Sequence, residues 1–176
     1  MRTRLTIASV LLLFLMQGRL CAGDLSAGMF NSVRGFGISL DYAAGSDILN
    51  SYMLYADTFG VYHGKYRDAG VKLVYLHYNR LTSFGSDSCE FDVVLGPGAS
   101  TGYARDRDSD RFGYLLTADI ALAIRAKYGR NIDLELGTFT ELGFITGESG
   151  GNFQLRMYDN GLYQSLLPFL KIMIRF

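Results

Sequence analysis

Seven ionisable side chains recur at alternate positions in the second half of the chain, and they are the residues best placed to do chemistry. They are Asp119, Arg125, Asp133, Glu135, Glu141, Lys171 and Arg175. Apolar residues lie between them, as in a strand whose two faces differ, so the charges should share one face of a sheet. A buried charge must be paired and hydrogen-bonded, because it otherwise costs several kcal/mol. The pattern predicts a buried ion-pair network, with the lining of a polar pore as the alternative.

The two histidines offer a second kind of chemistry. His63 lies in the polar segment H-G-K-Y-R-D-A-G, and His77 lies in the strand-like segment V-Y-L-H-Y-N-R. A serine nucleophile needs a base within hydrogen-bonding reach, and Ser83 and Ser86 follow His77 in the next polar segment. We interpret His77 as a wall residue of the sheet and keep a hydrolase as the alternative.

No other motif predicts a metal or a cofactor. The segment R-D-R-D-S-D-R (105–111) lacks the glycine and the closing glutamate of a calcium-binding EF-hand loop. Gly96, Gly98 and Gly102 lie within a strand and open no helix, so they do not form a dinucleotide-binding motif. Cys89 has no neighbouring group of His or Cys residues. We therefore expect no cofactor, no metal and no catalytic residue.

The elements that must position these residues are strands, because polar and apolar residues alternate along most of the chain. We expect a polar lead-in at 24–31 and then eight strands. They are 32–42, 49–60, 71–81, 90–104, 113–127, 131–143, 152–158 and the closing stretch 166–176. The strand at 71–81 is apolar on both faces, so its orientation stays open.

The composition of the two faces indicates which one points inward. One face is a continuous band of Leu, Ile, Val, Phe and Tyr, whereas the other carries glycines, serines and isolated charges of both signs. The chain has 21 Gly, 12 Tyr and 12 Phe but 2 Pro, a balance typical of closed antiparallel barrels. The sequence predicts an all-β fold, an eight-stranded antiparallel up-and-down transmembrane β-barrel. A secreted soluble lipocalin-like binding barrel is the alternative.

The end of the chain reads L-L-P-F-L-K-I-M-I-R-F and has one clean apolar face. Leu170, Ile172, Ile174 and Phe176 form that face. A barrel needs a regular last strand, because this strand must pair with the first to close the sheet. We therefore expect these residues to face lipid and to act as an assembly signal.

The first 23 residues have the features of a cleaved signal peptide. Arg2 and Arg4 precede the apolar run from Ile7 to Met16, and cleavage is expected after Ala22 or Gly23. Of the chain's 17 basic and 17 acidic residues this segment holds three arginines and no acid, which leaves 14 basic residues against 17 acidic. The barrel at 24–176 is thus mildly acidic, which argues against nucleic-acid binding. It also keeps a single cysteine, so no intrachain disulfide can form.

The signal segment, the eight alternating strands and the closing L-x-x-F-L-K-I-M-I-R-F resemble the small eight-stranded outer-membrane barrels. The transmembrane domain of OmpA, and OmpX, typify this family. The segment from Gly96 to Asp106 also resembles a signature of barrel proteins from Bacteroides-type bacteria. The resemblance implies a monomer in the outer membrane that contacts lipid and lipopolysaccharide and is recognised by the assembly machinery. His77 faintly resembles the histidine of the lipid A 3-O-deacylase, an eight-stranded barrel enzyme, but Asn79 stands where that family has its serine.

The predicted strands also predict which connectors share an end of the barrel. With both termini in the periplasm, the segments 61–70, 105–112 and 144–151 should lie at the same end as the termini. The turns at 128–131 and 159–161 should lie at the opposite, extracellular end. This arrangement is the reverse of the usual one, in which the periplasmic turns are short.

Overall fold

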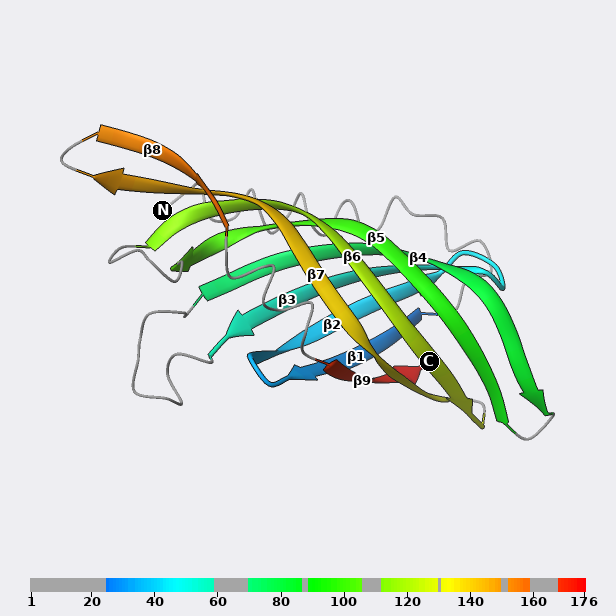
Figure 1. Cartoon of the computed structure of the whole chain (residues 1–176). Helices are drawn as coiled ribbons and strands as arrows, with labels where there is room; N and C mark the ends of the chain where they lie inside the picture. The colour runs from blue at the N-terminus through cyan, green and yellow to red at the C-terminus, as the bar shows by residue number, and fades with distance from the viewer. Residues whose placement is uncertain are drawn as a thin grey trace, which may run out of the picture.

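The computed structural model describes residues 25–58, 70–86, 89–105, 112–129, 131–149, 152–158 and 168–176, which are strands and the turns between them (Figure 1). The expected signal peptide, at 1–23, lies outside these residues. The strands are β1 (Leu25–Ser32), β2 (Gly35–Ala43), β3 (Ile48–Asp57), β4 (Gly70–Ser86), β5 (Cys89–Arg105), β6 (Phe112–Tyr128), β7 (Ile132–Ser149), β8 (Asn152–Met157) and β9 (Pro168–Arg175).

These strands close into one barrel. Strands β1 to β7 pair antiparallel in chain order, and β9 pairs antiparallel with both β7 and β1. Strand β9 pairs with residues 132–138 of β7, whereas β8 pairs with residues 144–149 of the same strand. β8 and β9 therefore share one position, and the fold has eight antiparallel strand positions in a closed up-and-down barrel. The predicted fold class is confirmed.

The register of the sheet sets the size of the barrel. Stepping between paired residues from Tyr128 of β6 through β7, β9, β1, β2, β3, β4 and β5 leads back to β6 at Ala118. The return point is ten residues from the start, so the strands are sheared and tilt by about 40° from the barrel axis. Eight strands at this tilt leave an interior just wide enough to be filled by side chains.

The first and last predicted strands need correction. Residues 25–31, expected as part of the lead-in at 24–31, belong to β1, and the predicted strand 32–42 corresponds to β2, which begins at Gly35. The predicted seventh strand is β8, which occupies the same position as the closing strand. The predicted number of strand positions, eight, is therefore correct, although the residues assigned to the first and seventh positions were partly wrong. Alternation in β1 is weak because its outward positions include Ala27, while the apolar Phe30 faces inward.

Because β1 precedes the predicted first strand, the connectors lie at the ends of the barrel opposite to those predicted. The backbone N–H of Phe176 donates to the Leu25 carbonyl, and that of Arg175 donates to the Asn131 carbonyl. Both ends of the described chain therefore lie beside the β6–β7 turn, at what we call the terminal end (Figure 1). The strands β1, β3, β5 and β7 end at the opposite end of the barrel, the loop end. The prediction that separated turn 128–131 from the termini is wrong, and the segment 159–161 lies outside the described residues.

Buried and exposed residues alternate regularly along β6 and along the first half of β4. In β6, buried residues from Gly113 to Arg125 alternate with exposed ones from Phe112 to Ile124. The same alternation orients β4, because Lys72, Val74, Leu76 and Tyr78 are buried while Val71, Leu73 and Tyr75 are exposed. The residue before Lys72 and the residue after it thus face outward.

Aromatic rings fill the middle of the interior. The Phe30 ring stacks on Phe169 at 4.7 Å between centroids and meets Phe139 edge-on at 6.5 Å. A Cβ on Gly96 would lie 2.7 Å from the Tyr78 ring, so a glycine is needed there for the tyrosine to fit. At Gly98 a Cβ would meet the Tyr75 carbonyl oxygen at 1.9 Å. The glycines of β5 therefore serve a bulky neighbour and a close backbone approach.

Candidate functional site

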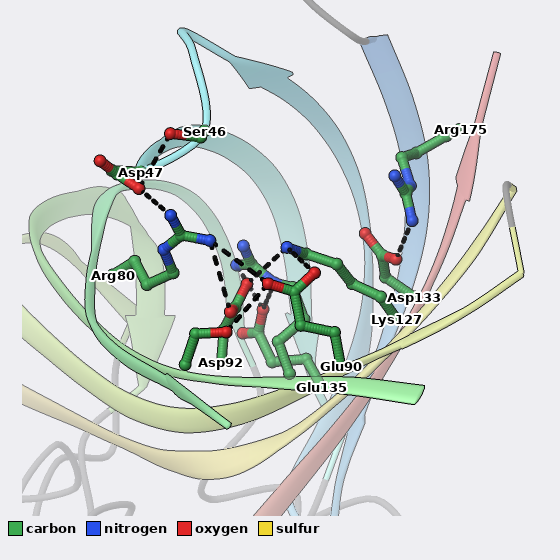
Figure 2. Close-up of polar contacts among 11 residues, drawn as sticks. Ser46, Asp47, Arg80, Glu90, Asp92, Lys127, Asp133, Glu135 and Arg175 are labelled. Atoms are coloured by element: carbon green, nitrogen blue, oxygen red, sulfur yellow. Dashed lines mark hydrogen bonds and ion pairs between the residues drawn. The ribbon is translucent and has the colours of Figure 1, made fainter. Parts of the chain in front are cut away.

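The charged interior is the candidate functional site, and its first part is a cluster at the terminal end. Lys127 Nζ lies 2.9 Å from Asp92 Oδ2 and 3.1 Å from Glu90 Oε2. The Arg80 guanidinium lies 3.7 Å from Asp92 and 3.5 Å from Glu90, and it also bonds to Asp47 (Figure 2). The strands β4, β5 and β6 bring these side chains together. Hydrogen bonds from Lys127 and Ser83 lower the pKa of Glu90 below its usual value.

This cluster borders a small polar cavity of about 130 Å³. Tyr78, Arg125, Asp133 and Arg175 also line it. One oxygen of Asp92 and the Nε of Arg175 are buried without a hydrogen-bond partner. A cavity of this volume has room for several waters, which could satisfy such atoms.

Three further cations each bond to one carboxylate; Lys171 and Arg125 lie deeper inside, and Arg175 lies at the terminal end. Lys171 Nζ lies 2.5 Å from Asp41 Oδ1 and 2.9 Å from Ser51 Oγ. The Arg125 guanidinium lies 2.8 Å from Glu135 Oε2, and its carbon is 5.3 Å from the centre of the Tyr78 ring. Arg175 lies 2.6 Å from Asp133 (Figure 2). These contacts tie the closing strand β9 to β2, β3 and β7.

The loop end of the interior holds two further ion pairs. Lys72 Nζ lies 2.6 Å from Glu141 Oε2, and both side chains are fully buried. Arg34 lies 3.0 Å from Asp57. The ring of Tyr158 lies over Lys72, with the ammonium 5.0 Å from the ring centre. This cation–π contact helps to hold the ammonium in place.

The seven predicted interior charges are buried or half-buried, and the structure pairs six of them. Lys171 bonds to Asp41 of β2 rather than to an acid of β6 or β7. Asp119 has no salt bridge with a cation among the described residues; its Oδ1 lies 2.6 Å from the Thr117 hydroxyl oxygen instead. The sequence did not single out Lys72, Arg34 or Asp57. Lys72 could have been found as the single lysine, arginine or acid in the apolar run from Val71 to Tyr78.

The predicted hydrolase residues do not come together. His77 lies on the outer side of β4, where its Nδ1 is 2.9 Å from Asn50 Oδ1. Ser83 instead donates to Glu90 at 2.9 Å, and it pairs across the sheet with the inward-facing Asp92. His63 lies outside the described residues.

The described residues contain no group of three metal-binding side chains, and Cys89 is an unpaired, half-buried thiol. Across the same ranges, no helix has the length and apolar character needed to span a membrane.

The closing strand presents its predicted apolar face to the outside. Leu170, Ile172 and Ile174 are exposed, and Phe176 is 78% exposed. Along the same strand, Phe169, Lys171 and Met173 are buried. β9 therefore both closes the sheet and supplies a cation to the interior.

Comparison with known proteins identifies the fold. The chain resembles the N-terminal β-barrel domain of Pseudomonas aeruginosa OprF, with a TM-score of 0.52 and 13% identity over 88% of this chain and 96% of that one. It also aligns with a major outer membrane protein from Thermus thermophilus, with a TM-score of 0.48 and 15% identity over 88% of this chain and 100% of that one. No protein-family model matches the sequence, and no curated protein is significantly similar.

Proposed function

We propose that the chain is an integral outer-membrane β-barrel with a plugged, charged interior, acting as a structural or surface-interaction protein. The observation that carries the proposal is the apolar outer surface of the barrel. Side chains exposed by about half or more include Ile38, Leu73, Leu116, Ile120, Leu136 and Ile174, and they lie all round it. A monomeric soluble protein rarely exposes a continuous apolar surface of this extent. Lipid is the solvent that matches it.

Aromatic residues on the outer surface support the same proposal. Toward the loop end, Tyr103 stacks on Phe112 at 5.4 Å and meets Tyr114 at 5.3 Å. Toward the terminal end, Phe84 stacks on Phe91 at 5.5 Å, and Tyr128 and Phe176 are exposed. Aromatic girdles of this kind mark the two lipid–water interfaces of outer-membrane barrels.

The interior supports a plugged barrel rather than a pore. Phe30, Phe139 and Phe169 lie in one core cluster with Met53 and Met173. Paired charges occupy the space on either side. A barrel of eight strands has no room for an aqueous channel beside such side chains.

The proposal also covers export, assembly and lipid contacts of the chain in the cell. We propose that residues 1–23 direct export, that β9 is read by the outer-membrane assembly machinery, and that lipid and lipopolysaccharide contact the outer surface. Membership of a Bacteroides-type family rests on the resemblance of the Gly96–Asp106 segment. No contact among the described residues favours a lipid A hydrolase.

Cell fractionation tests the proposal. The full-length chain, expressed in a Gram-negative host, should be recovered in the outer-membrane fraction and should migrate differently on a gel before and after boiling. Mass spectrometry of the recovered protein should give an N-terminus after Ala22 or Gly23. Recovery as a detergent-free soluble protein would contradict the proposal and favour the secreted barrel.

A further inference from the structure

Five polar side chains form a continuous chain of contacts in the loop-end half of the interior. They are Lys72 of β4, Ser100 of β5, Thr117 and Asp119 of β6, and Glu141 of β7. Lys72 Nζ lies 2.6 Å from Glu141 Oε2, and Ser100 Oγ lies 3.1 Å from Glu141 Oε1. Ser100 Oγ is 2.5 Å from Thr117 Oγ1, which is 2.6 Å from Asp119 Oδ1. Each of the five residues is at most 3% exposed.

The charges of this group do not balance if both carboxyl groups are ionised. Asp119 and Glu141 are directly paired across β6 and β7, and both side chains face inward. The one ammonium, on Lys72, bonds to Glu141, and the neighbouring Arg34 bonds to Asp57. Asp119 has no salt bridge with a cation of the described residues, and its Oδ2 has no hydrogen-bond partner. A carboxylate in this position would keep an uncompensated buried charge, which is strongly unfavourable.

The hydrogens of the group do not balance either. Three oxygen–oxygen contacts join Ser100, Thr117 and the two carboxyl groups, and each needs one hydrogen between its atoms. The two hydroxyls supply two hydrogens. One more proton completes the set.

We propose that Asp119 holds this proton and ends a buried chain of hydrogen bonds as a neutral carboxyl group. Asp119 donates to Thr117, Thr117 donates to Ser100, Ser100 donates to Glu141, and Lys72 neutralises Glu141. The inference concerns the folded barrel and does not depend on where in the cell it resides.

Infrared spectroscopy of the purified barrel in detergent tests the protonation. At neutral pH, the wild-type protein should show the C=O band of a protonated carboxyl group. The band should shift when aspartate is labelled with ¹³C, a measurement that needs no variant. It should be absent from Asp119→Asn and present in Asp41→Asn. Absence of a label-sensitive band in the wild type would overturn the proposal.

Thermal unfolding supplies a second readout. Asp119→Asn should keep its Tm within about 3 °C of the wild type, because the amide can donate the same hydrogen bond to Thr117. The matched control Asp41→Asn, which leaves Lys171 without its carboxylate, should lose roughly 10 °C. An equal loss in both variants would overturn the proposal.

The pH dependence has a defined sign. The folded wild type holds a proton on Asp119 that the unfolded chain releases above its ordinary titration range, so the folded state binds more protons. The Tm of the wild type should therefore fall relative to Asp119→Asn as the pH is raised from acidic to neutral. Parallel Tm curves for the two proteins would contradict a proton on Asp119.

Discussion

The buried ammonium group of Lys171 is important for the stability of the barrel. The side chain is 2% exposed, and the carboxylate that it contacts, on Asp41, is fully buried. Removing one partner of a buried ion pair leaves the other charge uncompensated, at a cost of about 3–5 kcal/mol. We expect Lys171→Met, which keeps the volume, to lower the free energy of unfolding by about that amount. Urea unfolding of the barrel in lipid vesicles, followed by circular dichroism, measures it.

Lys127→Met is the matched control. The Lys127 side chain is 25% exposed and contacts the exposed Glu90 and the buried Asp92, and Asp92 keeps Arg80 as a second cation when Lys127 is replaced. Exposed ion pairs contribute about 0–1 kcal/mol, so this variant should unfold close to the wild type. If the two lysine variants unfold at the same urea concentration, the buried pair does not have the importance assigned to it.

Gly96 tests how tightly the interior is filled. A Cβ at this position would lie 2.7 Å from the Tyr78 ring, so Gly96→Ala should destabilise the barrel by about 1–3 kcal/mol through overpacking. Gly147→Ala serves as the comparison, because its Cβ would approach only the flexible guanidinium of Arg156, at 3.3 Å. The measurement is the urea concentration at the midpoint of unfolding for both variants. A Gly96→Ala variant as stable as the wild type would mean that Tyr78 can move away.

For single residues, the sequence predicted which side chains face inward, but it predicted poorly which side chains contact one another. Alternation with apolar neighbours was enough to place Glu135 and Lys171 on the inner face. The pair of Lys171 with Asp41 joins residues that are 130 positions apart, and it depends on the order of strands around the barrel. Periodicity along one strand carries no information about that order.

Among the elements, β1 was missed because its alternation is weak. Ala27 and Gly28 are small, and the large apolar Phe30 faces inward to stack on Phe169. The closing strand shows the opposite case, with large apolar residues outside and Lys171 inside. A strand of small residues with an inward-facing aromatic ring, such as β1, is therefore difficult to recognise from its sequence, although tertiary packing accepts it.

The closing strand also supports a prediction about assembly. Phe176 is 78% exposed, and its backbone N–H donates to Leu25. Deleting Phe176 removes little buried surface, so refolding of the purified chain in detergent should change little. In cells, we expect the deletion to lower recovery in the outer membrane several-fold, because the assembly machinery would no longer find a terminal aromatic residue on the chain.

Phe176→Tyr keeps an aromatic residue and should restore recovery. The measurement is the amount of heat-modifiable protein in the outer-membrane fraction, set against the yield of refolding in detergent. An equal loss in both assays would assign Phe176 to stability instead of assembly.

For the whole molecule, one unrecognised strand changed the predicted topology although the fold class was right. An up-and-down barrel reverses direction at every strand, so adding β1 moves each later connector to the other end. The apolar outer surface does not depend on the number of strands before it, because it follows from alternation within each strand. The fold was therefore accessible from the sequence, whereas the ends of the barrel required the pairing of β9 with β1.

The corrected topology predicts which end faces the outside of the cell. Barrels of this size keep their termini and short turns in the periplasm and their longer connectors outside. Here Leu25 and Phe176, the ends of the described chain, lie with the β2–β3 turn at Ser46, while Val33 lies in the β1–β2 turn at the loop end. In a Cys89→Ser background, we expect a membrane-impermeant maleimide to label Val33→Cys on intact cells. Ser46→Cys should react only after the outer membrane is permeabilised. Labelling of Ser46→Cys on intact cells, with Val33→Cys protected, would reverse the orientation while leaving the barrel fold unchanged.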